Sequence, residues 1–326
     1  MLLSFVRKFK HIGILAILAL VAVSSAQAEM LRMGMITPPP HIWNNVAEHF
    51  ADDLLASSDK NFRTKIFPLG KLGGEQQMID MLQSGGIQMA VLTAGVLSNR
   101  ESSISGWFMP GMFADIDAAI NAAASSSAQE MLRKLSDHQL VGLGYTMAGM
   151  RHVLSREQID SLQAFENRKV RSFPNEVFSD WWQGLHAAPT AMPLSEVTPA
   201  LNTNLLDIVD VDLDIVVGLK LYQQAPNLLL TNHMAFPGII VASKPWWDSL
   251  SDQQRAMISA SISKAERWGF DLTKQREQES VDTLKGLGVN IESFEMSKLQ
   301  TVMDAVVKKY TSSNSGIAEF YQQNTQ

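Results

Sequence analysis

Apolar and polar residues follow regular periods along most of the chain. From residue 30 onward they predict a strand over 30–36, a helix over 43–55, a strand over 65–67, a helix over 75–82 and a strand over 87–92. This β-α-β-α-β order is typical of a mostly parallel α/β domain. The second half of the chain predicts strands over 140–145, 169–171, 208–211, 238–241 and 289–292, and helices over 114–135, 178–185, 252–284 and 296–310, with a further helix opening at 193. No repeat or linker-like composition separates the halves, so we expect two α/β lobes joined by several chain crossings.

Residues 1–28 have the pattern of a secretory signal peptide. Basic residues at positions 7, 8 and 10 precede an apolar run over 12–23, and Ala26-Gln27-Ala28 fits a small-residue cleavage site. The apolar run is short for a membrane-spanning helix, which needs roughly 20 residues; an uncleaved membrane anchor is the alternative. Cleavage after Ala28 removes three basic residues, so that the formal charge of −6 becomes −9. We therefore expect a soluble, acidic, exported protein.

Composition and charge exclude several classes of protein. Hydrophobic residues make up 46% of the 326 residues, which is ordinary for a folded protein. The acidic balance argues against nucleic-acid binding. The absence of cysteine excludes disulfides, thiolate metal sites and a cysteine nucleophile. The sequence also lacks HExxH, GxSxG and a complete GxGxxG. We expect neither a metal nor another cofactor.

Arg171 is a candidate anion-binding residue. It ends a short strand just before Ser172-Phe173-Pro174, and the carboxyl ends of strands in α/β proteins face the ligand crevice. A guanidinium there binds a carboxylate through two hydrogen bonds and stays charged. A surface arginine paired with a nearby acid has the same local pattern, so spacing alone leaves both interpretations open.

Several sequence blocks, in order, resemble those of one family. They are Pro40–Phe50, Phe67–Glu75 (FPLGKLGGE), Met81–Ala90, Lys169–Arg171, Trp182–Pro189, Met192–Val197, Thr231–His233 and Trp247–Ser251. Through them, residues 30–270 resemble the periplasmic solute-binding proteins of TRAP transporters, the DctP-like family. The resemblance implies an α/β fold with two lobes, strands exchanged between them, a hinge and a long helix that spans both. It places lobe I at about 29–148 plus 237–278, and lobe II at about 149–236 plus 279–326.

The resemblance also implies particular ligand-binding residues. Arg171 matches the family's carboxylate-clamping arginine, and Arg151 matches a second arginine that many members use. Leu194 stands where the family usually has Phe, and Val211 stands where it has a ligand-binding Asn. Further residues, from the other lobe, are expected near the cleft: His41, Trp43, Glu75 and Thr93.

Asp210 and Asp212 are a second departure from the family pattern. One interpretation is a charge network within lobe II. The other is that one of them receives an ammonium or hydroxyl group of the ligand. A buried carboxylate without a partner costs several kcal/mol, so either Asp needs a donor if it faces the cavity.

The resemblance implies a receptor that captures a small organic anion and delivers it to a TRAP membrane permease. The ligand is expected to be a carboxylate, with a slight preference for one that also bears an amine or hydroxyl group. We expect a monomer without enzymatic activity. Two alternatives remain at this point: a sensory partner of a membrane receptor, and a secreted hydrolase that uses carboxylates such as Glu75 or Asp210.

Overall fold

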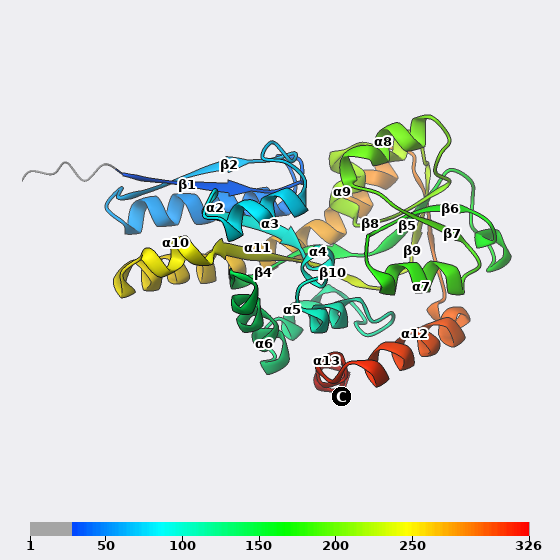
Figure 1. The fold of residues 1–326 in the computed structure, drawn as a ribbon. Coiled ribbons are helices and arrows are strands. Elements are labelled where there is room, and N and C mark those ends of the chain that lie inside the picture. Colours follow the sequence, from blue (N-terminus) through cyan, green and yellow to red (C-terminus); the bar gives the residue numbers. More distant parts are fainter. Residues whose placement is uncertain (1–27, 326) are drawn as a thin grey trace, which may run out of the picture.

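The computed structural model describes residues 28–325. The expected signal peptide, apart from its last residue, lies outside this range. Two mixed sheets form two lobes, each covered by helices (Figure 1). This confirms the two-lobed α/β fold. No helix among the described residues is long and apolar enough to cross a membrane.

The first sheet forms the core of one lobe. Its strands are, in spatial order, β2 (Phe62–Phe67), β1 (Glu29–Gly34), β3 (Met89–Thr93), β10 (Ala235–Ser243) and β4 (Leu140–Met150). β1 pairs in parallel with β2 and β3, while β10 is antiparallel to β3 and β4. The surrounding helices are α2 (Ile42–Ser57), α3 (Glu75–Gln83), α4 (Ala94–Leu97), η1 (Ser102–Phe108), α5 (Ile116–Ala122), α6 (Ser126–Lys134), η2 (Leu135–His138) and α10 (Lys244–Ser249).

The second sheet forms the core of the other lobe. Its strands are, in spatial order, β11 (Asn290–Ser293), β9 (Asn227–Leu230), β5 (His152–Ser155), β8 (Ile208–Val211), β6 (Lys169–Ser172) and β7 (Ala188–Ala191). Its helices are η3 (Gln163–Phe165), α7 (Glu176–Gly184), α8 (Leu194–Asn202), α9 (Leu213–Gly218) and η4 (Leu221–Gln223). Residues of α8 and α9 share one apolar cluster with the sheet, and residues of α7 share another with it.

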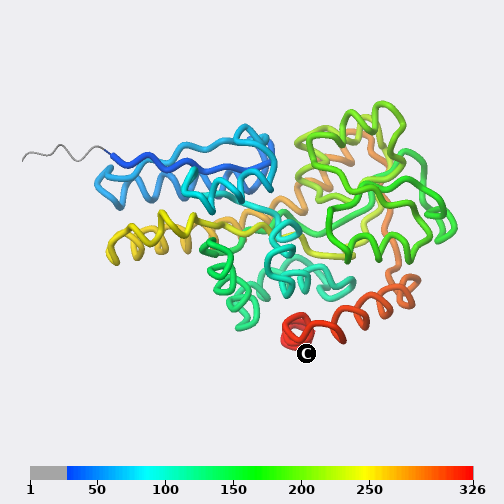
Figure 2. The backbone as a smooth tube through the Cα atoms, in the orientation of Figure 1, coloured from blue at the N-terminus to red at the C-terminus, as the bar shows by residue number. Residues whose placement is uncertain are grey.

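The chain crosses between the lobes at several places (Figure 2). Arg151 alone separates β4 of the first sheet from β5 of the second, and residues 231–234 connect β9 back to β10. The long helix α11 (Asp252–Gly286) packs against α2 of the first lobe and α9 of the second. The relative position of the two lobes, and with it the shape of the region between them, therefore depends on these crossings.

The C-terminal segment returns toward the first lobe. After β11, η5 (Met296–Leu299) and α12 (Gln300–Ser313) follow, and α12 packs on α7. The last helix, α13 (Ser315–Asn324), instead packs on η1 and α6 of the first lobe. The sequence-based boundaries assign this segment to lobe II, whereas the contacts of α13 are with lobe I. Asn314 accounts for the change of direction, because it ends α12 and caps α13.

The structure differs from the predicted elements at two further places. The helix expected over 114–135 is two helices, because the side chains of Asp115 and Ser125 each cap a new helical start. The short strands β5, β7 and β9 were not expected. Each has four residues, as do β6, β8 and β11, which the sequence did predict.

Candidate functional site

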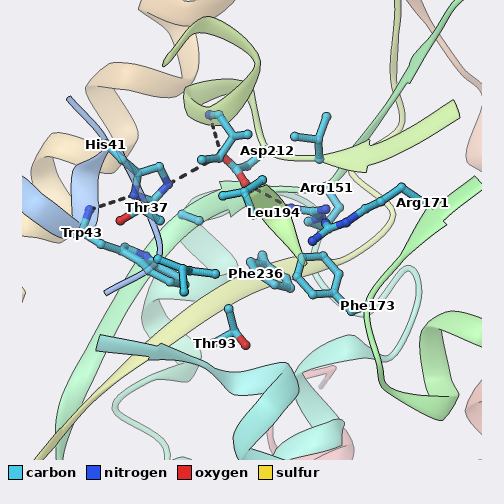
Figure 3. A pocket seen from close by; sticks show the side chains of 14 residues that line it. Thr37, His41, Trp43, Thr93, Arg151, Arg171, Phe173, Leu194, Asp212 and Phe236 are labelled. Carbon is cyan, nitrogen blue, oxygen red and sulfur yellow. Dashed lines mark hydrogen bonds and ion pairs between the residues drawn. The ribbon is translucent and has the colours of Figure 1, made fainter. Parts of the chain in front are cut away.

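Two adjoining hollows lie between the lobes, and we refer to them as the inner and outer hollow. They share Ile36, Arg171, Phe173 and Leu194 as lining residues. The outer hollow has a volume of about 380 Å³, within the size range of small-molecule sites, and the inner one about 20 Å³. Figure 3 shows the inner hollow, with side chains from both lobes around it.

Arg171 provides a buried cation to which no carboxylate of the described chain bonds directly. It lies in β6 and is 2% exposed. Its Nε donates to the carbonyl oxygen of Met192 at 3.3 Å; among residues 28–325 its guanidinium forms no ion pair with a carboxylate. A guanidinium carries five N–H donors, so four remain without a partner in the described chain. Burial and the like charge of Arg151 lower the pKa of Arg171 to about 9. A buried cation of this kind is stabilised by an incoming anion.

Two phenylalanine rings surround the guanidinium groups. The Cζ atom of Arg171 lies 3.9 Å from the ring centroid of Phe173. The Cζ atom of Arg151 lies 5.0 Å from Phe173 and 4.5 Å from Phe236. The two rings are themselves in contact, with centroids 4.4 Å apart. Their faces attract the cations and keep water away from them.

Arg151 differs from Arg171 because two carboxylates hold it. Its Nε donates to Asp210 Oδ1 at 2.6 Å and its Nη1 to Asp212 Oδ2 at 3.1 Å. Its Nη2 donates to the backbone oxygen of Asp210. Three of its five N–H donors are thus used, and two remain for the inner hollow that Arg151 lines.

Asp210 lies behind Arg151, away from both hollows. Its Oδ2 accepts from Trp182 Nε1 at 3.1 Å and lies 3.3 Å from His233 Nε2. Burial would raise the pKa of Asp210, but the charge of Arg151 and the contacts with His233 outweigh it and hold the pKa below its ordinary value. Both carboxylate oxygens have protein partners and Asp210 lines neither hollow, so this geometry favours the charge network over the expected ligand contact.

Asp212 lines the inner hollow but is also engaged within the protein. Its Oδ1 accepts the Ile215 N–H at 2.9 Å and so caps α9, while Oδ2 accepts from Arg151. Burial raises the pKa of Asp212, yet His41, Arg151 and the Ile215 N–H together lower it. Of the two interpretations left open by the sequence, these contacts correspond to the charge network.

Glu75 and Thr93 form the opposite wall. Glu75 begins α3 and lines the outer hollow; Thr93 ends β3 and lines the inner one. The Thr93 N–H donates to Glu75 Oε1 at 2.6 Å and its hydroxyl to Oε2 at 3.1 Å. Burial raises the pKa of Glu75 to about 7, against the effect of these two hydrogen bonds and of Arg171.

His41 and Trp43 close the inner hollow at the start of α2. His41 Nδ1 accepts the Trp43 backbone N–H at 3.1 Å, which leaves Nε2 facing Asp212 Oδ1 at 3.8 Å (Figure 3). The indole of Trp43 packs on Gly238, where a Cβ atom would lie 2.7 Å from the ring. The close approach of helix and sheet here requires glycine in β10.

Leu194 and Val211 supply apolar walls. Leu194 begins α8 and Val211 ends β8.

Of the ten residues expected from the sequence, nine line the hollows and Asp210 does not. Sequence reasoning missed the roles of Phe173 and Phe236. Phe173 was within reach, since it follows Arg171 by two positions, but nothing in the local pattern of Phe236 indicates a site.

Comparison with known proteins identifies the family of this chain. The family model for bacterial extracellular solute-binding protein, family 7 (DctP), matches residues 33–314. The sialic acid-binding periplasmic protein SiaP of Vibrio cholerae is 26% identical over 304 residues, covering 91% of this chain and 94% of SiaP. The 2,3-diketo-L-gulonate-binding periplasmic protein YiaO of Escherichia coli is 25% identical, covering 84% of each chain.

The fold has the same relatives. The sugar acid binding protein DctPAm of Advenella mimigardefordensis, solved in complex with galactonate, superposes with a TM-score of 0.86 at 24% identity, covering 92% of this chain and 97% of that one. The family match spans most of the sequence and confirms the resemblance seen in the sequence blocks. The chain therefore belongs to the DctP family of bacterial extracellular solute-binding proteins, the solute receptors of TRAP transporters.

Proposed function

We propose that this protein captures a small organic carboxylate between its lobes and that Arg171 binds the carboxylate group. The observation that carries the proposal is the buried Arg171 guanidinium, which has four free N–H donors within the described chain and lines both hollows. A carboxylate accepts two parallel N–H bonds from such a group. It would also supply the negative charge that the protein itself does not place there.

Binding and closure act together in this proposal. The two free N–H donors of Arg151 and the ring of Phe173 surround the bound carboxylate, and closure of the lobes removes water from it. The loss of water strengthens the ion pair, because the effective dielectric falls. The ligand thus favours the closed arrangement over an open one.

The proposed ligand class is a carboxylic acid that also bears hydroxyl groups. The outer hollow has room for more than a carboxylate, and Glu75 offers an acceptor there for a hydroxyl hydrogen. The names of the relatives point the same way, since they include binding proteins for sialic acid and 2,3-diketo-L-gulonate and a complex with galactonate.

The partner and the location follow from the family. We propose export to the periplasm with cleavage after Ala28, and delivery of the ligand to a TRAP permease in the membrane. The relatives named above are periplasmic binding proteins, which supports binding and release without chemical turnover.

Isothermal titration with galactonate, L-gulonate and glucuronate tests the proposal. Arg171→Ala should weaken the best ligand at least about thirtyfold, because truncating one partner of a desolvated charge pair costs about 2–5 kcal/mol. The matched control is Arg168→Ala, which removes a half-exposed arginine paired with Glu157 on the same lobe and should leave Kd unchanged. An unchanged Kd for Arg171→Ala, or a best ligand without an anionic group, would contradict the proposal.

A further inference from the structure

We infer that this site accepts one negative charge, so that it binds monocarboxylates in preference to dicarboxylates of the same carbon skeleton. The inference rests on the proposed function, which it deepens by setting the charge of the ligand. It depends on how the buried charges between the lobes compensate one another.

The buried charges sum to zero before a ligand arrives. Among residues 28–325, four charged side chains other than histidine are buried: Arg151, Arg171, Asp210 and Asp212. Both carboxylates bond to Arg151. The two carboxylates carry one negative charge more than Arg151, and this excess acts on Arg171 only at a distance. No carboxylate of the described chain bonds to Arg171, which is therefore the cation that can pair directly with a ligand.

The remaining lining residues provide no second cation. No lysine and no arginine other than these two line either hollow in the described chain. Glu75 is the acidic residue on the wall of the outer hollow, and Asp212 is the one on the wall of the inner hollow. His41 lies 3.8 Å from Asp212 and 4.0 Å from Asp214, so any charge on it is shared with two acids.

A second carboxylate on the ligand would therefore be desolvated without a counter-charge. In the inner hollow it would face the charged Asp212, and in the outer hollow it would meet Glu75, whose pKa of about 7 leaves part of it ionised at neutral pH. Ion desolvation without compensation is strongly unfavourable. A hydroxyl group at the same place meets Glu75 as a hydrogen-bond acceptor instead, and this difference discriminates between the two ligand classes.

Asp212 is the specificity-determining residue in this scheme, because it is the charged acid on the wall of the inner hollow. Asp212→Asn removes that charge and can keep the oxygen that accepts the Ile215 N–H, since Asn is as good a helix cap as Asp. The group that replaces Oδ2 is then an NH2 donor, so Arg151 Nη1 loses this acceptor while Arg151 keeps its bonds to Asp210. The four buried charges of the variant sum to +1 instead of zero.

Matched acid pairs test the inference by titration calorimetry on the purified protein. The probes are galactonate against galactarate, gluconate against glucarate, and butyrate against succinate, each pair differing by one carboxylate. We expect the monocarboxylate to bind at least tenfold more tightly within the best-bound pair. In Asp212→Asn this ratio should fall at least tenfold. The control Asp160→Asn, which removes an exposed charge from the same lobe, should leave the ratio unchanged.

The outcomes separate the inference from the proposed function. A dicarboxylate that binds as tightly as its partner, through Arg171, overturns the inference and leaves the proposed function standing. A folded Asp212→Asn with an unchanged ratio also overturns it. Absence of binding by every carboxylate, or binding insensitive to Arg171→Ala, overturns both. If Asp212→Asn does not fold, the ratio measured for the original protein decides.

Discussion

The backbone N–H of Ile42 donates a 2.7 Å hydrogen bond to Asp214 Oδ2, and this bond joins the two lobes. Ile42 begins α2 of the first lobe, and Asp214 lies in α9 of the second. Arg276, in α11, donates to Asp214 Oδ1 at 3.1 Å and to the carbonyl oxygen of Pro40 at 2.6 Å. Neither Asp214 nor Arg276 lines the two hollows, so this contact holds the two lobes together without lining the proposed ligand site.

Asp214→Ala should weaken ligand binding only by weakening the contact between the two lobes, since Asp214 lines neither hollow. The substitution removes hydrogen bonds that involve a charged group, each contributing about 1.5–3 kcal/mol at most, so we expect Kd to rise roughly tenfold. Calorimetry gives Kd, and small-angle scattering of the ligand-free protein should show a more open average shape. The control Asp53→Ala removes an ion pair between α2 and Lys264 of α11 and should change neither. A closed shape with unaltered Kd in Asp214→Ala would argue against this role.

Asp210→Ala should destabilise the protein strongly. The change leaves Arg151 with one fewer counter-charge in a buried site and removes the acceptor of Trp182 Nε1. Breaking a buried pair in this way costs about 3–5 kcal/mol. Urea denaturation at pH 7 measures the free energy of unfolding. In contrast, Asp248→Ala breaks an exposed pair with Lys244 and should cost about 1 kcal/mol or less.

The difference in stability between the original protein and Asp210→Ala depends on pH in a defined way. The pKa of Asp210 is lower in the folded protein than its ordinary value. Its stabilising contribution is therefore present above the unfolded-state pKa of about 3.9 and is lost as the pH falls through the lower, folded-state pKa. The gap in stability between the original protein and Asp210→Ala should narrow only under strongly acidic conditions. A gap that closes already at pH 5 would refute the assignment.

Glu75→Gln should make the stability of the protein less dependent on pH between about pH 4.5 and 7. The pKa of Glu75 rises from 4.5 to about 7 on folding, so the folded protein holds a proton that the unfolded chain has released. Stability from this group is complete below 4.5 and is lost as the pH rises to 7 and above. Melting temperatures at pH 5, 6, 7 and 8 should fall more steeply for the original protein than for Glu75→Gln. Parallel slopes would contradict the prediction.

Phe173→Leu should weaken binding while the apolar wall is kept. The ring lies 3.9 Å from the Arg171 Cζ atom and also contacts Phe236. Losing the cation–π contact of a desolvated arginine costs about 1–2 kcal/mol, which corresponds to roughly a 5- to 30-fold rise in Kd. Calorimetry with the best carboxylate measures it. Phe165→Leu, at a buried ring packed on Trp182 outside both hollows, controls for general loosening of the lobe.

The sequence predicted the elements with long periods and the residues near strand ends. The strand that contains Arg171 is recognisable because a turn signal follows it. The start of α3 at Glu75 is recognisable because a turn signal precedes it. The arrangement between the lobes was less accessible. β5 has four residues, and its pairing with β8, where Val153 lies opposite Asp210, brings Arg151 to two carboxylates about sixty positions away in the sequence.

The role of Asp210 shows why such contacts escape sequence reasoning. Alternation within β8 indicates a buried strand but does not identify what lies behind it. Trp182, His233 and Arg151 reach Asp210 from three separate segments, and the choice between ligand contact and charge network depends on how these pack. The sequence therefore left both interpretations open, and the contacts in the structure correspond to the charge network.

Arg151 also lies where the chain passes between the lobes, and its backbone is tied to the second crossing. Its N–H donates to Met234 O at 2.7 Å, and its carbonyl oxygen accepts the His233 N–H at 3.3 Å. If one lobe rotates about this point, each atom is displaced in proportion to its distance from the pivot. Arg151 then keeps its partners during the whole rotation, while Leu69 and Ser195, which line the outer hollow, move further. The inner hollow, which lies near the pivot, would thus change less during such a rotation than the outer hollow.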